Sequence, residues 1–355
     1  MGGEGSDTGH AEQVGAPSEA YINQEAMGWG LGASVEEGRS DMKVVMAWSH
    51  GADVPALRAA YPGIEIVEVE RASLVDVIGD ADVVYGGGLT GAELRAAHRL
   101  KWIHSPGAGV EWVHACDGLA DSGVTVTNTR GAHAQTIAEH TFAMLLYFTR
   151  GLGRLIDAQR EHRWAGNFLD NVGISGMTFG VIGLGRIGTE IAKRAHAFDM
   201  RVIALDANDV PRPSFVDRVL RVDGLPTLVA ESDVIAVAIP ITPETRGFYH
   251  AGHINAMRPR SYLMVLSRGG IVDEAAVASA LHSGHLAGAG LDVFGNEPLE
   301  EGSPLWGAPN VLLTPHVSGT SHQTTSLNWG MFVENVGRFE KGEALQNVID
   351  VRRGY

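Results

Sequence analysis

Three residues in the second half of the chain carry the groups that an acid–base reaction on a small anion needs: Arg268, Glu297 and His316. An imidazole can give or take a proton near neutral pH, because its unperturbed pKa is about 6.5. A carboxylate that accepts a hydrogen bond from one ring nitrogen fixes the tautomer and favours the protonated ring. A planar guanidinium can bind a carboxylate through two parallel hydrogen bonds. These residue types therefore predict a site that binds an acid and transfers a proton.

All three residues lie just beyond apolar segments that have the composition of buried strands. The predicted strands are Tyr262–Leu266, Ala287–Asp292 and Val311–Thr314. Ligands of open α/β sheets bind beyond the carboxyl ends of the strands, so side chains from three separate loops can meet there. Taken singly, His316 could be a packed histidine at a strand end, Arg268 a surface ion-pair partner and Glu297 a turn residue. Their shared position favours one common site.

A glycine-rich segment precedes these loops. Gly183, Gly185 and Gly188 have the G-x-G-x-x-G spacing, with Arg186 and Ile187 between the last two glycines. The segment closes a predicted strand at 177–183 and opens a predicted helix, which is the context that the motif requires. The first glycine permits a tight turn, the second lets a pyrophosphate reach the backbone, and the third lets the helix pack on the strand. The segment therefore predicts a dinucleotide site.

The residue that ends the next predicted strand bears on which dinucleotide is bound. Asp206 follows Gly188 by 18 residues. A carboxylate at this place accepts hydrogen bonds from the ribose hydroxyls and repels a 2′-phosphate, so the sequence predicts NAD, with NADP as the less favoured cofactor. Arg212 lies a few residues further on and could reach a 2′-phosphate, which keeps the second cofactor open at this point.

Parallel strands must position these residues, and the chain shows the alternation of strand and helix patterns that forms a parallel sheet. Strands and helices alternate from Lys43 to about 127, which predicts a flavodoxin-like first half, and six strands from 177 to 314 predict a doubly wound second half. Thr90 and Glu93 have the spacing of a helix capping box. Between the halves, a pattern over 136–159 predicts one long helix, which could lie in a core, link two domains or form a dimer seam.

Composition excludes several classes of protein. The chain has 355 residues, with 27 Lys and Arg against 42 Asp and Glu, so its net charge of −15 argues against a nucleic-acid partner. No apolar run approaches the roughly 18 residues that would span a membrane. Its one cysteine cannot form an internal disulfide, which fits a reducing compartment. We therefore expect a cytoplasmic protein, with residues 1–41 as a disordered acidic tail, whether a solubilising segment or an over-extended gene start.

The histidines offer no metal site. His133 and His140, and likewise His282 and His285, are spaced to share helix faces, but no acidic or cysteine pattern completes a zinc site. We expect these four residues to lie at the surface or to pack in the fold, and we predict no metal.

Three segments carry a resemblance to a known family. Residues 265–274, 291–299 and 314–319, together with the glycine motif, resemble the D-isomer-specific 2-hydroxyacid dehydrogenases over about residues 43–350. The resemblance implies two doubly wound parallel-sheet α/β domains with the active site in the cleft between them, and usually a homodimer. It places the substrate-binding domain at 42–145 and 318–350 and the NAD-binding Rossmann domain at 146–317. Arg163 and Trp164, after the long helix, could reach across a dimer, although packing would also explain them.

The resemblance also implies roles for individual residues. His316 would protonate the carbonyl of a small 2-oxo acid, Glu297 would hold the far ring nitrogen, and Arg268 would bind the substrate. Backbone N–H groups of Ala108 and Gly109 would hold the substrate carboxylate. Further cofactor contacts would come from the strand-end positions Pro240, Thr245, Leu266, Asp292, His316 and Gly319, with Asp292 on the nicotinamide carboxamide.

Some positions depart from the family pattern, and they concern substrate preference. Val265 stands where the family often has Asn, and Glu111 where it commonly has Asp. The implied function is NAD-dependent reduction of a glyoxylate-, hydroxypyruvate- or phosphoglycerate-type acid. Glu297 argues against a formate dehydrogenase, which has Gln there. A phosphite dehydrogenase keeps the same three residues, and so does an NAD(H)-sensing corepressor, although the acidic chain gives the corepressor little support.

Overall fold

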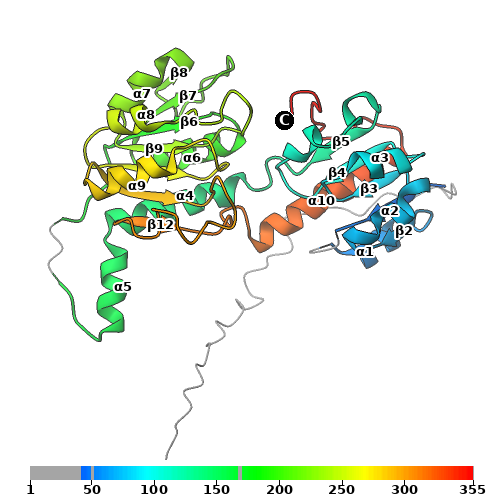
Figure 1. The fold of residues 1–355 in the computed structure, drawn as a ribbon, viewed down its shortest axis with the longest axis horizontal. Coiled ribbons are helices and arrows are strands. Elements are labelled where there is room, and N and C mark those ends of the chain that lie inside the picture. The colour runs from blue at the N-terminus through cyan, green and yellow to red at the C-terminus, as the bar shows by residue number, and fades with distance from the viewer. Residues whose placement is uncertain (1–40, 49–51, 167–169, 355) are drawn as a thin grey trace, which may run out of the picture. The chain divides into compact units, whose positions relative to one another are not determined.

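The computed structural model describes residues 41–354 except 49–51 and 167–169. The predicted acidic tail therefore lies, apart from Asp41, outside the described residues. Within them, two parallel sheets form (Figure 1), which confirms the predicted fold class. No helix of the described part is long and apolar enough to cross a membrane. The cytoplasmic location stays a prediction.

The first sheet has five strands in the order β2-β1-β3-β4-β5, which is the flavodoxin-like order. Its strands are β1 (Lys43–Met46), β2 (Glu65–Glu68), β3 (Val83–Tyr85), β4 (Trp102–Ser105) and β5 (Thr125–Asn128). The helices between them are α1 (Val54–Ala60), α2 (Leu74–Val77) and α3 (Gly91–Ala96). The capping box predicted for Thr90 and Glu93 is present at the start of α3.

The second sheet has seven strands in the order β12-β11-β10-β9-β6-β7-β8. They are β6 (Thr178–Ile182), β7 (Arg201–Leu205), β8 (Arg218–Leu220), β9 (Val234–Val237), β10 (Ser261–Val265), β11 (Leu286–Leu291) and β12 (Val311–Leu313). The order reverses between β6 and β9, and a reversal of this kind is where doubly wound sheets bind ligands. The sequence predicted six strands and missed β8, a three-residue strand at the sheet edge that is only half-buried.

Apolar residues fill both faces of the second sheet. One core combines α4 (Ala134–Thr149) and α6 (Arg186–Ala197) with the sheet, and the other combines α7 (Leu225–Glu231), α8 (Ala251–Ala256) and α9 (Glu274–His282) with it. Ile137, Phe142 and Leu145 of α4 belong to the first of these cores. Helix α4 therefore packs with the second sheet, whereas the predicted domain boundary at 145 and 146 divides this helix.

The single helix predicted over 136–159 is wrong. Helix α4 ends at Thr149 and a separate helix, α5 (Leu152–Arg160), begins after Gly151. Gly151 has a φ of 60°, the left-handed conformation in which glycine commonly ends a helix. Because the break redirects the chain, Leu145 is buried in the core while Leu152 is exposed, and the two parts of the predicted helix do not share one buried face.

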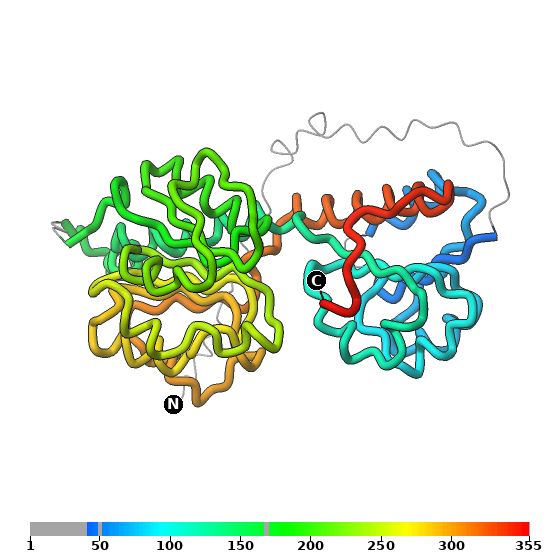
Figure 2. Tube along the Cα trace, turned by 90° about the horizontal axis from the view of Figure 1, so that it is seen from above, coloured from blue at the N-terminus to red at the C-terminus, as the bar shows by residue number. Residues whose placement is uncertain are grey.

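After β12 the chain returns to the first sheet. Helix α10 (His322–Glu340) places Phe332 and Val336 in a core with β1, β3 and β4, and Val348 pairs with Thr127 beside β5. Figures 1 and 2 both show this orange and red segment beside the blue and cyan elements of the five-stranded sheet. The second sheet is therefore inserted between the two parts of the chain that build the first sheet and its helices.

Candidate active site

The glycine motif forms a tight turn between β6 and α6. Gly183 has a φ of 95°, which side chains rarely adopt. A Cβ on Gly188 would clash with the carbonyl oxygen of Gly183, so only glycine lets α6 approach the strand this closely. A Cβ on Gly185 would meet nothing within 4 Å. The space above Gly185 and the free amides of the first turn of α6 thus fit the phosphates of a dinucleotide.

Asp206 lies beside this turn. Its Oδ2 accepts a hydrogen bond from the Leu184 N–H at 2.8 Å, and its Oδ1 accepts one from the Asn208 N–H at 2.8 Å. The carboxylate is thereby held where the sequence predicted a ribose partner. Arg212, the residue that kept NADP open, donates from Nη1 to the carbonyl of Val216 at 2.6 Å. That bond gives its guanidinium a structural partner within its own loop.

His316 and Glu297 meet as predicted. The Nδ1 atom of His316 lies 2.7 Å from Oε2 of Glu297, and the other carboxylate oxygen accepts a hydrogen bond from the Phe294 N–H at 2.9 Å. The glutamate is thus anchored before it orients the ring. Among the described residues, Nε2 of His316 has no hydrogen-bond partner, so this nitrogen is free to exchange a proton with a ligand.

Asp292 holds the loop that presents His316. Its fully buried carboxylate accepts three hydrogen bonds, from the Thr314 hydroxyl at 2.5 Å and from the N–H groups of Val317 and Ser318 at 2.9 Å each. His316 itself has a φ of 55°, a left-handed conformation that costs about 1–2 kcal/mol for most residues. The three bonds offset this cost. The sequence did not predict this role, and the carboxamide contact of Asp292 stays a prediction.

Arg268 contacts a residue that the sequence did not pair with it. Its Nε donates to Oε1 of Glu111 at 2.5 Å, and its Nη1 donates to the Ser267 carbonyl at 2.8 Å. Burial acts to raise the pKa of Glu111, but the charge and hydrogen bond of Arg268 outweigh it and lower the pKa, with a smaller contribution from His316. Glu111 is therefore ionised at neutral pH, and the charges of Arg268 and His316 both act on it.

The loop before Glu111 presents free amides next to Arg268. The carbonyls of Pro106, Gly107 and Ala108 accept hydrogen bonds from Asn128 and Thr129. In the described part of the chain, the N–H groups of Ala108 and Gly109 have no acceptor. A Cβ on Gly109 would clash with Nη2 of Arg268, so this backbone lies against the guanidinium. The arrangement can bind a carboxylate from two sides.

Two histidines that were expected to be surface or packing residues contact these loops. His133 lies with Nδ1 3.1 Å from the Gly319 carbonyl oxygen, and His140 lies with Nε2 3.1 Å from the Thr314 hydroxyl. Burial lowers the pKa of His133, and the charge of Arg268 lowers it further, so this ring is neutral at pH 7. Their spacing along one helix was the available signal, but it did not show what the helix faces.

The remaining predicted cofactor residues occupy the same edge of the second sheet. Pro240 follows β9, and its carbonyl accepts a hydrogen bond from the Thr245 hydroxyl at 2.7 Å. Leu266 follows β10 directly, and Gly319 lies in the loop after β12. No group of three or more His, Cys, Asp or Glu suited to a metal ion occurs in the part of the chain that the structure describes.

Comparisons with known proteins point to one family. A family model described as "D-isomer specific 2-hydroxyacid dehydrogenase, NAD binding domain" matches residues 142–318. The D-3-phosphoglycerate dehydrogenase of Mycobacterium tuberculosis is 33% identical over 312 residues, which is 88% of this chain and 56% of that protein. The glyoxylate reductase of Korarchaeum cryptofilum is 35% identical over 264 residues, covering 72% of this chain and 77% of the relative.

A solved structure is similar across the whole fold. The D-isomer specific 2-hydroxyacid dehydrogenase of Xanthobacter autotrophicus, solved in complex with NADPH and MES, gives a TM-score of 0.76 at 30% identity. The match covers 89% of this chain and all of that one. The chain spans about half the length of the first curated relatives that it matches.

Proposed function

This chain belongs to the D-isomer-specific 2-hydroxyacid dehydrogenase family, and from that premise we propose that it interconverts a small 2-oxo acid and its 2-hydroxy acid with NAD(H). The observation that carries the proposal is the His316–Glu297 pair, with Nδ1 and Oε2 2.7 Å apart and Nε2 free. A pair of this kind suits proton exchange with an oxygen atom. The comparisons favour neither a corepressor nor a phosphite dehydrogenase.

In the proposed reaction, the side chains of this site bind the acid and move one proton. Arg268 and the amides of Ala108 and Gly109 hold the substrate carboxylate. Nε2 of His316 gives its proton to the carbonyl oxygen, and Glu297 stabilises the ring through both protonation states. When bound at the turn formed by Gly183–Gly188, NADH supplies the hydride. In the reverse direction, Nε2 takes the proton from the hydroxyl.

We expect NADH to be oxidised in the presence of a panel of 2-oxo acids such as glyoxylate, hydroxypyruvate and 3-phosphohydroxypyruvate, with NADPH less efficient. The cofactor preference follows from two residues. The carboxylate of Asp206 would repel a 2′-phosphate, and the guanidinium of Arg212, which could attract one, donates a hydrogen bond to the Val216 carbonyl instead. The measurement is kcat/KM for each acid with both cofactors in parallel. Absence of turnover with every acid would contradict the function, and higher efficiency with NADPH would contradict the cofactor preference.

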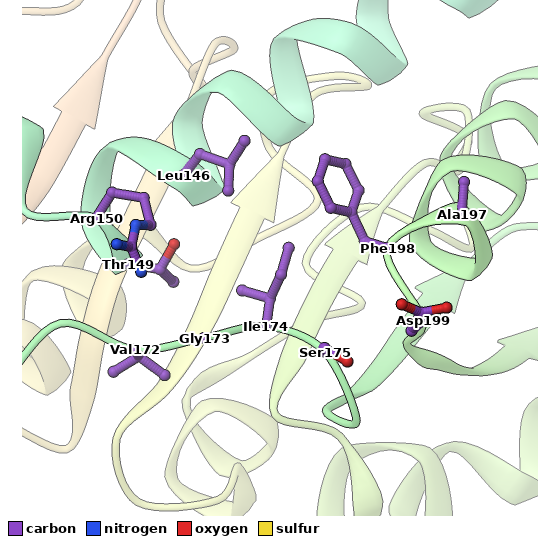
Figure 3. Close-up of a pocket in the computed structure, with 10 residues that line it drawn as sticks. All are labelled: Leu146, Thr149, Arg150, Val172, Gly173, Ile174, Ser175, Ala197, Phe198 and Asp199. Carbon is purple, nitrogen blue, oxygen red and sulfur yellow. The ribbon is translucent and has the colours of Figure 1, made fainter.

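We also propose a homodimer, supported by unpaired apolar surfaces around α5. Leu152 and Ile156 on this helix are exposed, and Trp164 beyond it is 99% exposed. Nearby, a cavity of about 350 Å³ lies between the end of α4, residues 172–175 and the end of α6. Figure 3 shows Leu146, Ile174 and Phe198 around it. Apolar side chains of a second copy would cover such a surface.

The dimer has a direct test in solution. We expect the chain to sediment as a dimer at micromolar concentration, and the double variant Leu152→Asp, Ile156→Asp to sediment as a monomer, because charge on an apolar interface is costly. Val222→Asp, at an exposed apolar position just before α7, is the matched control and should remain dimeric. A monomeric wild-type chain would refute this assembly.

A further inference from the structure

A second carboxylate contacts the loop that carries Glu297. We propose that Glu274 is a positioning residue for the proton transfer: it holds this loop in place, and its negative charge favours the protonated form of His316. The inference rests on the proposed function, because it adds a residue to that reaction. It gives a role to a half-buried acidic group that the reaction does not otherwise use.

The first step of the argument is that two carboxylates bind the same loop. Gly295 donates its N–H to Oε1 of Glu274 at 2.6 Å, and the preceding residue, Phe294, donates its N–H to Oε1 of Glu297 at 2.9 Å. Consecutive amides are therefore bonded to different carboxylates. Because Oε2 of Glu297 lies 2.7 Å from Nδ1 of His316, the bond from Gly295 fixes the loop from which Glu297 reaches the ring.

The second step is the packing of this loop against the loop that follows Arg268. A Cβ on Gly269 would clash with the carbonyl oxygen of Phe294, so only glycine lets the two backbones approach this closely. A Cβ on Gly295 would lie 3.5 Å from Oε1 of Glu274, in ordinary contact. Glu274 is the first residue of α9. A regular helix therefore supports the contact that holds the loop.

The third step is that no cation opposes the charge of Glu274. Burial raises the pKa of this carboxyl, the backbone hydrogen bond lowers it, and the charges of Glu297 and Asp273 raise it, with a raised pKa as the result. Arg246 lies beside Gly270 on the neighbouring loop. Even so, no Lys or Arg in the described part of the chain forms an ion pair with Glu274.

An unopposed charge in a half-buried site acts on the groups beside it. Glu111 also acts on His316, but its charge is already opposed by Arg268, whereas the charge of Glu274 adds to that of Glu297. The repulsion between these two carboxylates is offset when His316 takes up a proton, since the positive ring attracts both. Glu274 therefore favours the form of His316 that can give a proton to the carbonyl oxygen.

The test is the pH dependence of Glu274→Gln, which keeps an acceptor for the Gly295 N–H and removes the charge. For reduction of the best 2-oxo acid, we expect the fall of kcat/KM at high pH to move to lower pH by about half a unit to one unit. Stability separates this role from a structural one. Because the raised pKa of Glu274 means that its charge destabilises the fold at neutral pH, Glu274→Gln should not lower Tm.

A second measurement, on the protein without substrate, does not depend on turnover. The ring signals of His316, identified by their loss in His316→Asn, are followed by NMR as the pH is varied. We expect their titration midpoint to move down in Glu274→Gln by the same amount as the kinetic profile. Glu274→Ala should move it likewise and also lower kcat about tenfold, because the Gly295 N–H then has no acceptor and the loop is less firmly held.

The matched control is Glu301→Gln, which removes the same charge from an exposed position in the chain just beyond Glu297. Solvent and salt screen a charge there, so the kinetic profile and the NMR midpoint should keep their wild-type values. An unchanged midpoint of His316 in Glu274→Gln overturns the proposal, as does an equal shift in Glu301→Gln. Failure of the proposed function is distinguishable, because no 2-oxo acid would then turn over while the NMR titration still reports on Glu274.

Discussion

Replacing His316 with asparagine lowers kcat for 2-oxo acid reduction by about 10²- to 10⁴-fold, the usual contribution of a general acid. The amide cannot donate a proton as an acid, yet asparagine suits the site, because His316 has a φ of 55° and asparagine tolerates left-handed backbone. The variant should therefore keep its fold. Stopped-flow or steady-state kinetics measure the loss, and fluorescence titration with NADH shows whether cofactor binding persists.

A matched change tests the partner of His316 in the same assay. Glu297→Gln keeps a hydrogen-bond acceptor near Nδ1 but removes the charge, so its loss of turnover should be smaller than that of His316→Asn. Near-normal turnover of His316→Asn would remove this residue from the mechanism. A large loss of NADH affinity would instead point to a structural role for the loop that Asp292 holds.

Replacing Arg268 with lysine is expected to lower kcat/KM for the 2-oxo acid by about 10²-fold, and replacing it with alanine by more. Hydrogen bonds to charged groups contribute about 1.5–3 kcal/mol each, and an ammonium cannot reproduce the planar pair. Lysine keeps a positive charge beside Glu111, so the difference between the two variants separates charge from geometry. The measurement is steady-state kinetics with the acid varied at saturating NADH.

Two controls accompany this experiment. Arg258→Lys alters an arginine that pairs with Asp233 outside the site and should leave kcat/KM unchanged. The Michaelis constant for NADH should not move in Arg268→Lys, because this side chain contacts no residue of the glycine motif. If the lysine variant retains wild-type kcat/KM, Arg268 does not bind the substrate carboxylate.

Features that depend only on residues close together in the sequence could be predicted from the sequence. The turn at Gly183–Gly188 and the capping box at Thr90 are both present. Each depends on contacts within a few residues, so residue type and spacing carry the information. The positions of Arg268 and His316 beyond strand ends were also predictable, because hydrophobic runs mark the strands.

Other features were decided only by the tertiary structure. Glu111 and Arg268 are 157 residues apart in the chain, and nothing local pairs them. Asp292 is another example, because its three donors come from a loop more than 20 residues away. The order of strands and the direction in which each crossover returns bring such groups together. Hydrophobic periodicity shows where strands occur but not which strands become neighbours, so contacts between loops of different strands cannot be obtained from the pattern alone.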